Sequence, residues 1–163
     1  MAEKSRSQKT LEEAIRFEVE GRDFFLKAAD QTKNYFAKLI FQTIAEDELD
    51  HIQRVKKIHE HLLHSEKKEP TLPVPKMSSL RTIFRQAKEQ MDSKAILNAD
   101  EMEAIRLAVQ LEIKGHEFYK RLAEEATRPF EKTFYQQLAQ EESTHFSTLH
   151  EMEEAMMKGT TFG

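Results

Sequence analysis

The stretch AIRFEVEGRDFF, residues 14–25, decides the fold because it returns as AVQLEIKGHEFY at residues 108–119. The constant offset of 94 residues continues without a gap to residues 51 and 145, and 11 of the 38 aligned positions are identical. We refer to residues related by this offset as repeat-mates. Apolar residues recur at helical spacing in both copies, so we predict that the chain is a duplicated helical hairpin.

Working outward from the repeat, we predict the hairpins at residues 10–64 and 99–158. Thr10 is expected to cap the first helix, with Glu13 completing a capping box. The second helix is expected to start near Asn34, the third at the stretch NADE, residues 98–101, and the fourth at Pro129.

The crossover between the hairpins is predicted at residues 65–98. Its first part, SEKKEPTLPVPKMSS at 65–79, contains three prolines, and no helix is expected to cross it. A short amphipathic helix should follow. Its apolar face would consist of Leu80, Ile83, Phe84, Ala87 and Met91.

These elements predict an all-α protein with a single domain spanning 1–163. Two hairpins joined by one long connection form an antiparallel four-helix bundle, with the short extra helix in the crossover. A chain of 163 residues is long enough to bury a core of this kind.

Composition excludes several kinds of site and partner. Without cysteine the chain has no disulfides, thiolate zinc sites or iron–sulfur ligands, so a metal could be held by Glu, Asp, His or water. The net charge of −4 argues against a nucleic-acid surface. The chain shows neither an apolar signal region nor a membrane-length apolar run, so we expect a cytoplasmic protein without membrane contact.

Two Glu-x-x-His pairs stand at equivalent places in the repeat: Glu48 and His51 in AEDELDH, and Glu142 and His145 in AQEESTH. Chance alone would supply about one such pair in a Glu-rich chain, so the position of the pairs in the helices must decide whether they are functional. Heptad spacing places both pairs on the apolar stripes of the second and fourth helices. Those stripes are Phe41, Ile44, Val55, Ile58 and Leu62 around the first pair, and Tyr135, Leu138, Leu149, Met152 and Met156 around the second.

One glutamate also interrupts the apolar stripe of each of the other two long helices, Glu18 in the first and Glu112 in the third. Small residues flank each of them, which leaves space beside the carboxylate. Four carboxylates in one bundle core cannot all stay ionised without a counter-charge, because burial and mutual repulsion raise their pKa values. Two divalent cations would supply that charge, and oxygen with imidazole ligands suits iron, manganese or zinc.

This six-residue set resembles the ferritin-like superfamily, and most closely its rubrerythrin-type di-iron carboxylate domain, over residues 10–158. The resemblance implies that Glu48 and Glu142 bridge two iron ions. It further implies that the other four ligands complete the two shells in pairs: Glu18 with His51, and Glu112 with His145.

In such proteins a tyrosine two turns after the first-helix glutamate often contacts a ligand. Here that position is Phe25, and its repeat-mate Tyr119 is the candidate for this contact and for a supporting catalytic role. Asp47, Asp50 and Glu141 lie next to the ligands in sequence. Any of them could support an imidazole, but for each we expect exposure to solvent.

The chain also departs from the rubrerythrin pattern. It has no cysteine for a rubredoxin module, so electrons would come from a separate donor protein or from substrate iron. Gly115 replaces an additional glutamate, which leaves a symmetric four-Glu, two-His site as in bacterioferritins. Leu49 replaces their haem-binding methionine, so no haem is expected. Among the remaining histidines, His59, His61 and His64 could form a weak surface metal site, although a solvated helix end explains them as well.

The resemblance favours a non-haem di-iron oxidoreductase that reduces peroxide or O2, and it implies a homodimer. Two alternatives stay open. One is a ferroxidase or another iron-handling protein, and the other is a helical binding module that a metal braces without turnover.

Overall fold

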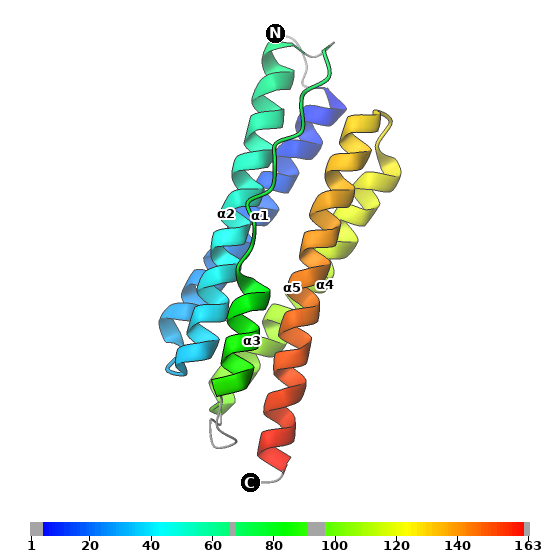
Figure 1. Ribbon diagram of the computed structural model, residues 1–163. Coiled ribbons are helices and arrows are strands. Elements are labelled where there is room, and N and C mark those ends of the chain that lie inside the picture. Colours follow the sequence, from blue (N-terminus) through cyan, green and yellow to red (C-terminus); the bar gives the residue numbers. More distant parts are fainter. Residues whose placement is uncertain (1–4, 66–67, 91–96, 162–163) are drawn as a thin grey trace.

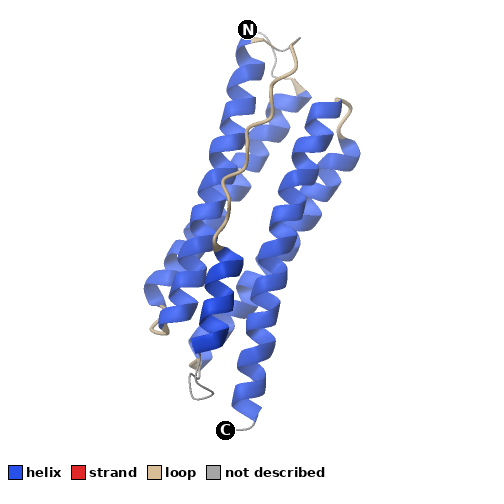
Figure 2. Ribbon diagram, viewed as in Figure 1, coloured by secondary structure: helices blue, strands red, loops and turns tan. Residues whose placement is uncertain are grey.

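The computed structural model describes residues 5–65, 68–90 and 97–161, with backbone alone for Gln90 and for 156–161 (Figure 1). In these ranges the chain forms helices joined by loops, as Figure 2 shows. The helices are α1 (Arg6–Gln31), α2 (Tyr35–His64), α3 (Leu80–Gln90), α4 (Ala99–Glu125) and α5 (Pro129–Thr161).

The start of α1 differs from the prediction. Ser5 caps it by accepting a hydrogen bond from Gln8 N at 3.2 Å, and the Gln8 side chain returns the contact to Ser5 N. The expected cap at Thr10 is therefore wrong, because Ser5 and Gln8 provide the same capping box one turn earlier. Thr10 lies inside the helix and donates to Arg6 O.

The other starts agree with the sequence, since Asn34 caps α2, Asn98 caps α4 and α5 begins at Pro129. Glu101 closes the capping box of α4 and also accepts hydrogen bonds from the backbone N–H groups of Lys33 and Asn34. This side chain ties the α1–α2 loop to the second hairpin. α5 continues to Thr161, beyond the predicted end at 158.

The α1–α2 hairpin packs beside the α4–α5 hairpin, and the crossover runs along the bundle between them (Figure 1). It leaves the end of α2, travels down the bundle and enters α3, which packs against α2 and α5. This arrangement confirms the predicted helical bundle of two hairpins and a long crossover. None of the helices in the described ranges is long and apolar enough to cross a membrane.

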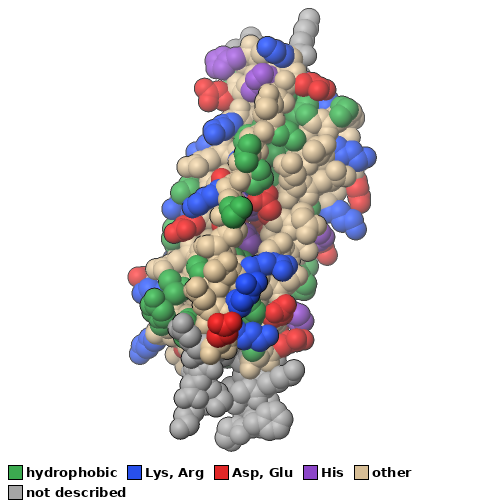
Figure 3. Space-filling view, in the orientation of Figure 1, with side chains coloured by type: hydrophobic (Ala, Val, Ile, Leu, Met, Phe, Trp, Pro, Cys, Tyr) green, Lys and Arg blue, Asp and Glu red, His purple; other side chains and the backbone are tan. Residues whose placement is uncertain are grey.

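Two apolar clusters fill the core on either side of a central polar layer. One contains Phe25, Phe41, Ile44 and Leu149, and the other contains Leu11, Val55, Tyr119, Tyr135 and Leu138. Every residue of the predicted stripes is buried where the structure describes its side chain. Met91, predicted for the apolar face of α3, and the Met156 side chain, predicted for the stripe of α5, lie outside the described part. Charged side chains of both signs are spread over the face that Figure 3 shows.

Candidate metal centre

The central layer brings together all six residues that the sequence singled out as ligands. Their exposed fractions are 0–3%. They form two groups, in each of which one ligand atom per residue lies within 4.8 Å of the others. Glu18, Glu48, His51 and Glu142 make the first, and Glu48, Glu112, Glu142 and His145 make the second.

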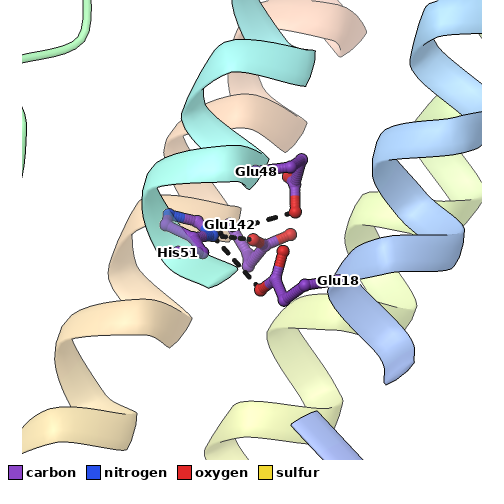
Figure 4. Close-up of side chains that lie close together, drawn as sticks. All are labelled: Glu18, Glu48, His51 and Glu142. Carbon is purple, nitrogen blue, oxygen red and sulfur yellow. Dashed lines mark hydrogen bonds and ion pairs between the residues drawn. The ribbon is translucent and has the colours of Figure 1, made fainter. Parts of the chain in front are cut away.

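Glu48 and Glu142 belong to both groups, so they occupy the shared position that a bridging ligand requires. Figure 4 shows the first group, in which the carboxylates of Glu18, from α1, and Glu142, from α5, converge on His51 of α2. Each group takes side chains from both hairpins, so only the assembled bundle forms it.

The two imidazoles present the same nitrogen to the centre. His51 Nδ1 lies 3.2 Å from Glu18 Oε1 and 3.0 Å from Glu142 Oε1. His145 Nδ1 lies 3.3 Å from Glu48 Oε1 and 3.5 Å from Glu112 Oε2. The rings are nearly parallel, with an interplanar angle of 16° and centroids 6.0 Å apart. Both histidines are thus positioned to ligate through Nδ1.

The outer nitrogen of each ring faces a further carboxylate. His145 Nε2 lies 2.9 Å from Asp47 Oδ2, and His51 Nε2 lies 3.5 Å from Glu141 Oε1. Asp47 and Glu141 are repeat-mates, and each faces the histidine of the other hairpin. The expected exposure is therefore wrong for Asp47, which is buried, and for Asp50 and Glu141, which are partly buried. Contacts between the hairpins cover Asp47 and Glu141, because each faces a histidine of the other hairpin.

Asp50 and Arg54 join this outer layer, and Arg54 was not among the residues predicted for the site. The Arg54 side chain is 2% exposed, with Nη2 lying 2.6 Å from Glu141 Oε2 and Nε 3.1 Å from Asp50 Oδ2. The i, i+4 spacing of Asp50 and Arg54 is a helical ion-pair pattern that could have indicated it. The repeat-mate of Arg54 is Thr148, so the second hairpin has no cation at the equivalent position.

Ser78 of the crossover takes the corresponding place in the other half. Its hydroxyl donates a hydrogen bond of 2.5 Å to Asp47 Oδ2. The two outer carboxylates therefore have different partners, a guanidinium for Glu141 and a hydroxyl for Asp47. No signal in the sequence of the crossover marks Ser78, because only the path of that segment along α2 brings it to Asp47.

Tyr119 of α4 donates a hydrogen bond to Glu18 Oε1 at 2.5 Å. The predicted contact with a ligand carboxylate is present, and it reaches the glutamate of the other hairpin. The repeat-mate Phe25 has no hydroxyl, so Glu112 has no equivalent partner. This hydrogen bond breaks the symmetry of the site.

The pKa values of the buried carboxylates are shifted in different directions. Burial, and then the charges of Glu142, Glu18 and Glu112, raise the pKa of Glu48 well above its usual range. Burial and the charge of Glu142 likewise raise the pKa of Glu112. Burial alone would raise the pKa of Glu18, but the charge of His51 and several hydrogen bonds outweigh it, so that pKa is lowered.

The pKa values of the two histidines are raised by the charges of the same carboxylates. Burial would lower the pKa of His51, but Glu18 and hydrogen bonds raise it well above its usual value. Glu112 acts in the same way on His145 and raises its pKa. Without a metal, protonated imidazoles therefore supply part of the counter-charge for the four carboxylates.

The residues present fit a pair of divalent metal ions. Several of their inward atoms are buried without a hydrogen-bond partner, although some lie at ion-pair distance from each other. These atoms are Glu18 Oε2, Glu48 Oε1, Glu112 Oε2, Glu142 Oε1 and His145 Nδ1. Unpaired buried polar atoms are costly, and carboxylate oxygens with imidazole nitrogens are suitable ligands for iron, manganese or zinc.

Comparison with known proteins agrees with this geometry. The family model for rubrerythrin matches residues 9–153. The chain belongs to the rubrerythrin family. It is thereby placed in the ferritin-like superfamily of di-iron carboxylate proteins, which implies iron binding at the carboxylate and histidine cluster.

A hypothetical protein from Pyrococcus furiosus is similar in structure to this rubrerythrin-family chain. The two are 23% identical, with a TM-score of 0.67, and the match covers 93% of this chain and 90% of that chain. At this identity the similarity shows the fold alone. No curated protein matches the chain.

Gly115 decides how much space this rubrerythrin-family site has on one side. A Cβ atom there would lie 2.7 Å from Glu142 Oε2 and 3.3 Å from Phe17 Cε1. At its repeat-mate Gly21 the nearest atom, Glu48 Oε2, would be 3.8 Å away. Glu142 in this position leaves no room for a larger residue at 115, including the additional glutamate of the rubrerythrin pattern.

The three histidines near the end of α2 do not assemble a further site. His59 faces Glu12 at 3.5 Å, and His61 Nε2 lies 2.6 Å from the carbonyl oxygen of Lys68. Within the described ranges, metal-ligand spacing is found in the two central groups and not at these histidines. The solvated helix end is the better explanation for them.

Proposed function

We propose that this protein is a non-haem di-iron oxidoreductase that reduces peroxide or O2. The observation that carries the proposal is the pair of buried ligand groups sharing Glu48 and Glu142. Two ferrous ions held close together can each give an electron to a bound oxidant. Manganese or zinc would fit the same ligands, so metal identity is part of the proposal.

The chain's own residues would hold and orient the two ions. Glu48 and Glu142, which belong to both groups, would be shared by the two ions, while Glu18 with His51 and Glu112 with His145 would complete the two ligand sets. Asp47 Oδ2 accepts a hydrogen bond from the N–H group of His145 Nε2, which leaves the Nδ1 lone pair free to ligate. Glu141 faces His51 Nε2 in the same way. Burial would raise the pKa of Glu141, but its contacts with His51 and Arg54 outweigh burial and lower that pKa.

Access to the centre is provided by a cleft of about 200 Å³ beneath the crossover. It lies over α2 and α5, and its lining includes His145, Asp47, Asp50, Glu141 and Ser78. Small oxidants and metal ions can enter here, while the apolar clusters on both sides of the ligand layer keep bulk water away. This cleft therefore offers a route to the centre that is lined by polar and charged residues.

The test is anaerobic loading with Fe(II), followed by mixing with H2O2 or O2 in an absorbance cell. We expect a pair of iron ions per chain and a near-ultraviolet band of the oxidised pair. Faster oxidation by H2O2 supports the peroxidase form of the proposal. Bound metal that shows no redox response would overturn it in favour of the metal-braced module.

Ferroxidase activity is the second candidate, and the acidic cleft favours it. Asp47, Asp50 and Glu141 would attract Fe²⁺ as substrate toward the centre. Continued oxidation of many iron ions per chain, with O2 preferred over H2O2, would support this candidate. The homodimer, the separate electron-donor protein and the cytoplasmic location stay predictions, and particle size distinguishes a dimer from a storage cage.

A further inference from the structure

Two buried tyrosines stack beside the metal centre. Tyr119 of α4 and Tyr135 of α5 are 0% and 1% exposed. Their ring centroids are 6.2 Å apart and their planes differ by 19°. The Tyr119 hydroxyl donates to Glu18, so one end of this pair contacts a residue of the centre directly.

The internal repeat provides a comparison for this pair. The repeat-mates of Tyr119 and Tyr135 are Phe25 and Phe41, whose ring centroids are also 6.2 Å apart. Phenylalanines therefore fill the equivalent place in the other half of the bundle. Packing alone does not require hydroxyl groups at positions 119 and 135.

The Tyr135 hydroxyl is buried and has no hydrogen-bond partner in the part of the chain that the structure describes. A buried, unpaired hydroxyl costs stability relative to the phenyl ring that Phe41 has. Such a group calls for an explanation other than packing. The chemical difference between the side chains is that a phenol can lose one electron together with its proton, whereas a phenyl ring cannot.

The outer end of the pair borders a cleft, although Tyr135 itself is buried. Tyr135 lines a small cleft where α1 begins and α4 ends, together with Arg6, Ser7 and Glu131. The chain contains no Trp and no Cys, and its third tyrosine, Tyr35, is 67% exposed at the start of α2, at the opposite end of the bundle. Tyr119 and Tyr135 are thus a continuous path of oxidisable rings from the centre to this cleft.

We propose that Tyr119 and Tyr135 form a relay that carries single electrons to the metal centre from a small reductant of the hydroquinone or ascorbate class. The relay rests on the proposed function. Reduction of O2 to water takes four electrons, and a ferrous pair supplies two. The relay supplies the other two, one at a time, and solvent supplies the protons that complete water.

Each transfer is balanced. Tyr119 gives an electron to the centre while its phenolic proton moves to Glu18 Oε1. Tyr135 then gives an electron to the Tyr119 radical, which takes its proton back from Glu18, and the Tyr135 proton leaves into the cleft. The reductant finally gives a hydrogen atom to the Tyr135 radical, so the reductant is oxidised and both tyrosines are restored.

The experiment mixes Fe(II)-loaded protein with excess O2, freezes the mixture rapidly and records its electron paramagnetic resonance spectrum. We expect a tyrosyl radical in the wild type, none in Tyr119→Phe, and a radical trapped on Tyr119 in Tyr135→Phe. With ascorbate present, the trapped radical should decay at least about tenfold more slowly than the wild-type radical. One H2O2 per iron pair should give no radical, because it takes only two electrons.

Tyr35→Phe is the matched control and should behave as the wild type. Decay of the radical in Tyr135→Phe at the wild-type rate would overturn the relay and leave Tyr119 only its hydrogen bond to Glu18. Iron-free protein, oxidised by a flash-generated ruthenium(III) tris-bipyridine complex, separates this outcome from failure of the proposed function. There the Tyr119 radical should form in the wild type and be lost in Tyr135→Phe, whereas equal yields would contradict the relay whether or not iron is oxidised.

Discussion

Asp47 of α2 pairs with His145 of α5 across the bundle, with 2.9 Å between Oδ2 and Nε2. The contact joins the two hairpins and holds the imidazole so that Nδ1 faces Glu48 and Glu112. Glu141, the repeat-mate of Asp47, faces His51 of the first hairpin. The ligand set is therefore oriented by carboxylates that each hairpin provides to the other.

Asp47→Ala should weaken metal binding by about 10–100-fold, because His145 loses the group that orients it. Titration with Fe(II) or Zn(II), followed by metal analysis, would measure the loss. Glu46→Ala is the control, since this neighbouring carboxylate is exposed and lies 4.0 Å from Lys76 at the surface. Equal affinities in the two variants would show that Asp47 does not orient the ligand.

Glu48→Ala or Glu142→Ala should abolish binding of the metal pair while the protein stays helical. Both residues belong to both ligand groups, so either change removes a ligand that we propose the two ions share. Metal content and circular dichroism together make the measurement. Retention of the full metal pair in either variant would contradict the bridging roles. The metal-free variants should unfold at a higher temperature than the metal-free wild type, because carboxylate repulsion is relieved.

The metal-free protein should lose stability as pH rises above about 5. Raised carboxyl pKa values, as for Glu48 and Glu112, mean that the folded chain keeps protons that the unfolded chain has already lost above its pKa of 4.5. The raised histidine pKa values act in the same direction, with their contribution present below 6.5 and lost as pH passes the folded value. Glu18, whose pKa is lowered, has the opposite effect on stability. Its stabilising contribution is present above pH 4.5 and is lost as pH falls below that value, so it does not change the trend at higher pH.

Thermal unfolding across this range, with and without metal, measures the effect. Metal binding should become tighter as pH rises, because the ligands must be deprotonated. The metal-induced increase in Tm should therefore be larger at the alkaline end. A metal-free Tm that rises steadily with pH would contradict the assignment of the shifted groups.

Gly115→Ala and Gly21→Ala form a matched pair of substitutions. A methyl group at 115 would meet Glu142 Oε2 at 2.7 Å and displace the carboxylate that we propose as a bridge, whereas at 21 it finds ordinary contact at 3.8 Å. We expect Gly115→Ala to lose metal affinity. Gly21→Ala should keep metal affinity and gain up to about 1 kcal/mol from its better helix propensity. Equal metal affinities in the two variants would show that Glu142 can move without cost.

Several features of the protein follow from the sequence alone. The offset of 94 residues, the spacing of the apolar stripes and the prolines between 65 and 79 were sufficient to predict two hairpins and a long crossover. The six candidate ligands were also identifiable, because a glutamate or histidine that interrupts an apolar stripe must face the core at helical periodicity. Periodicity reports the direction of a side chain from its own helix, and these features depend on nothing else.

Other features were decided by the tertiary structure. The exchange of Asp47 and Glu141 between hairpins, the burial of Arg54 and the contact of Ser78 with Asp47 depend on which helices lie beside each other. The partner of Tyr119 is another example, since the sequence predicted a ligand carboxylate but only the packing of α4 against α1 selects Glu18. These contacts join residues far apart in the chain, and their distances are set by the packing of whole helices and the path of the crossover.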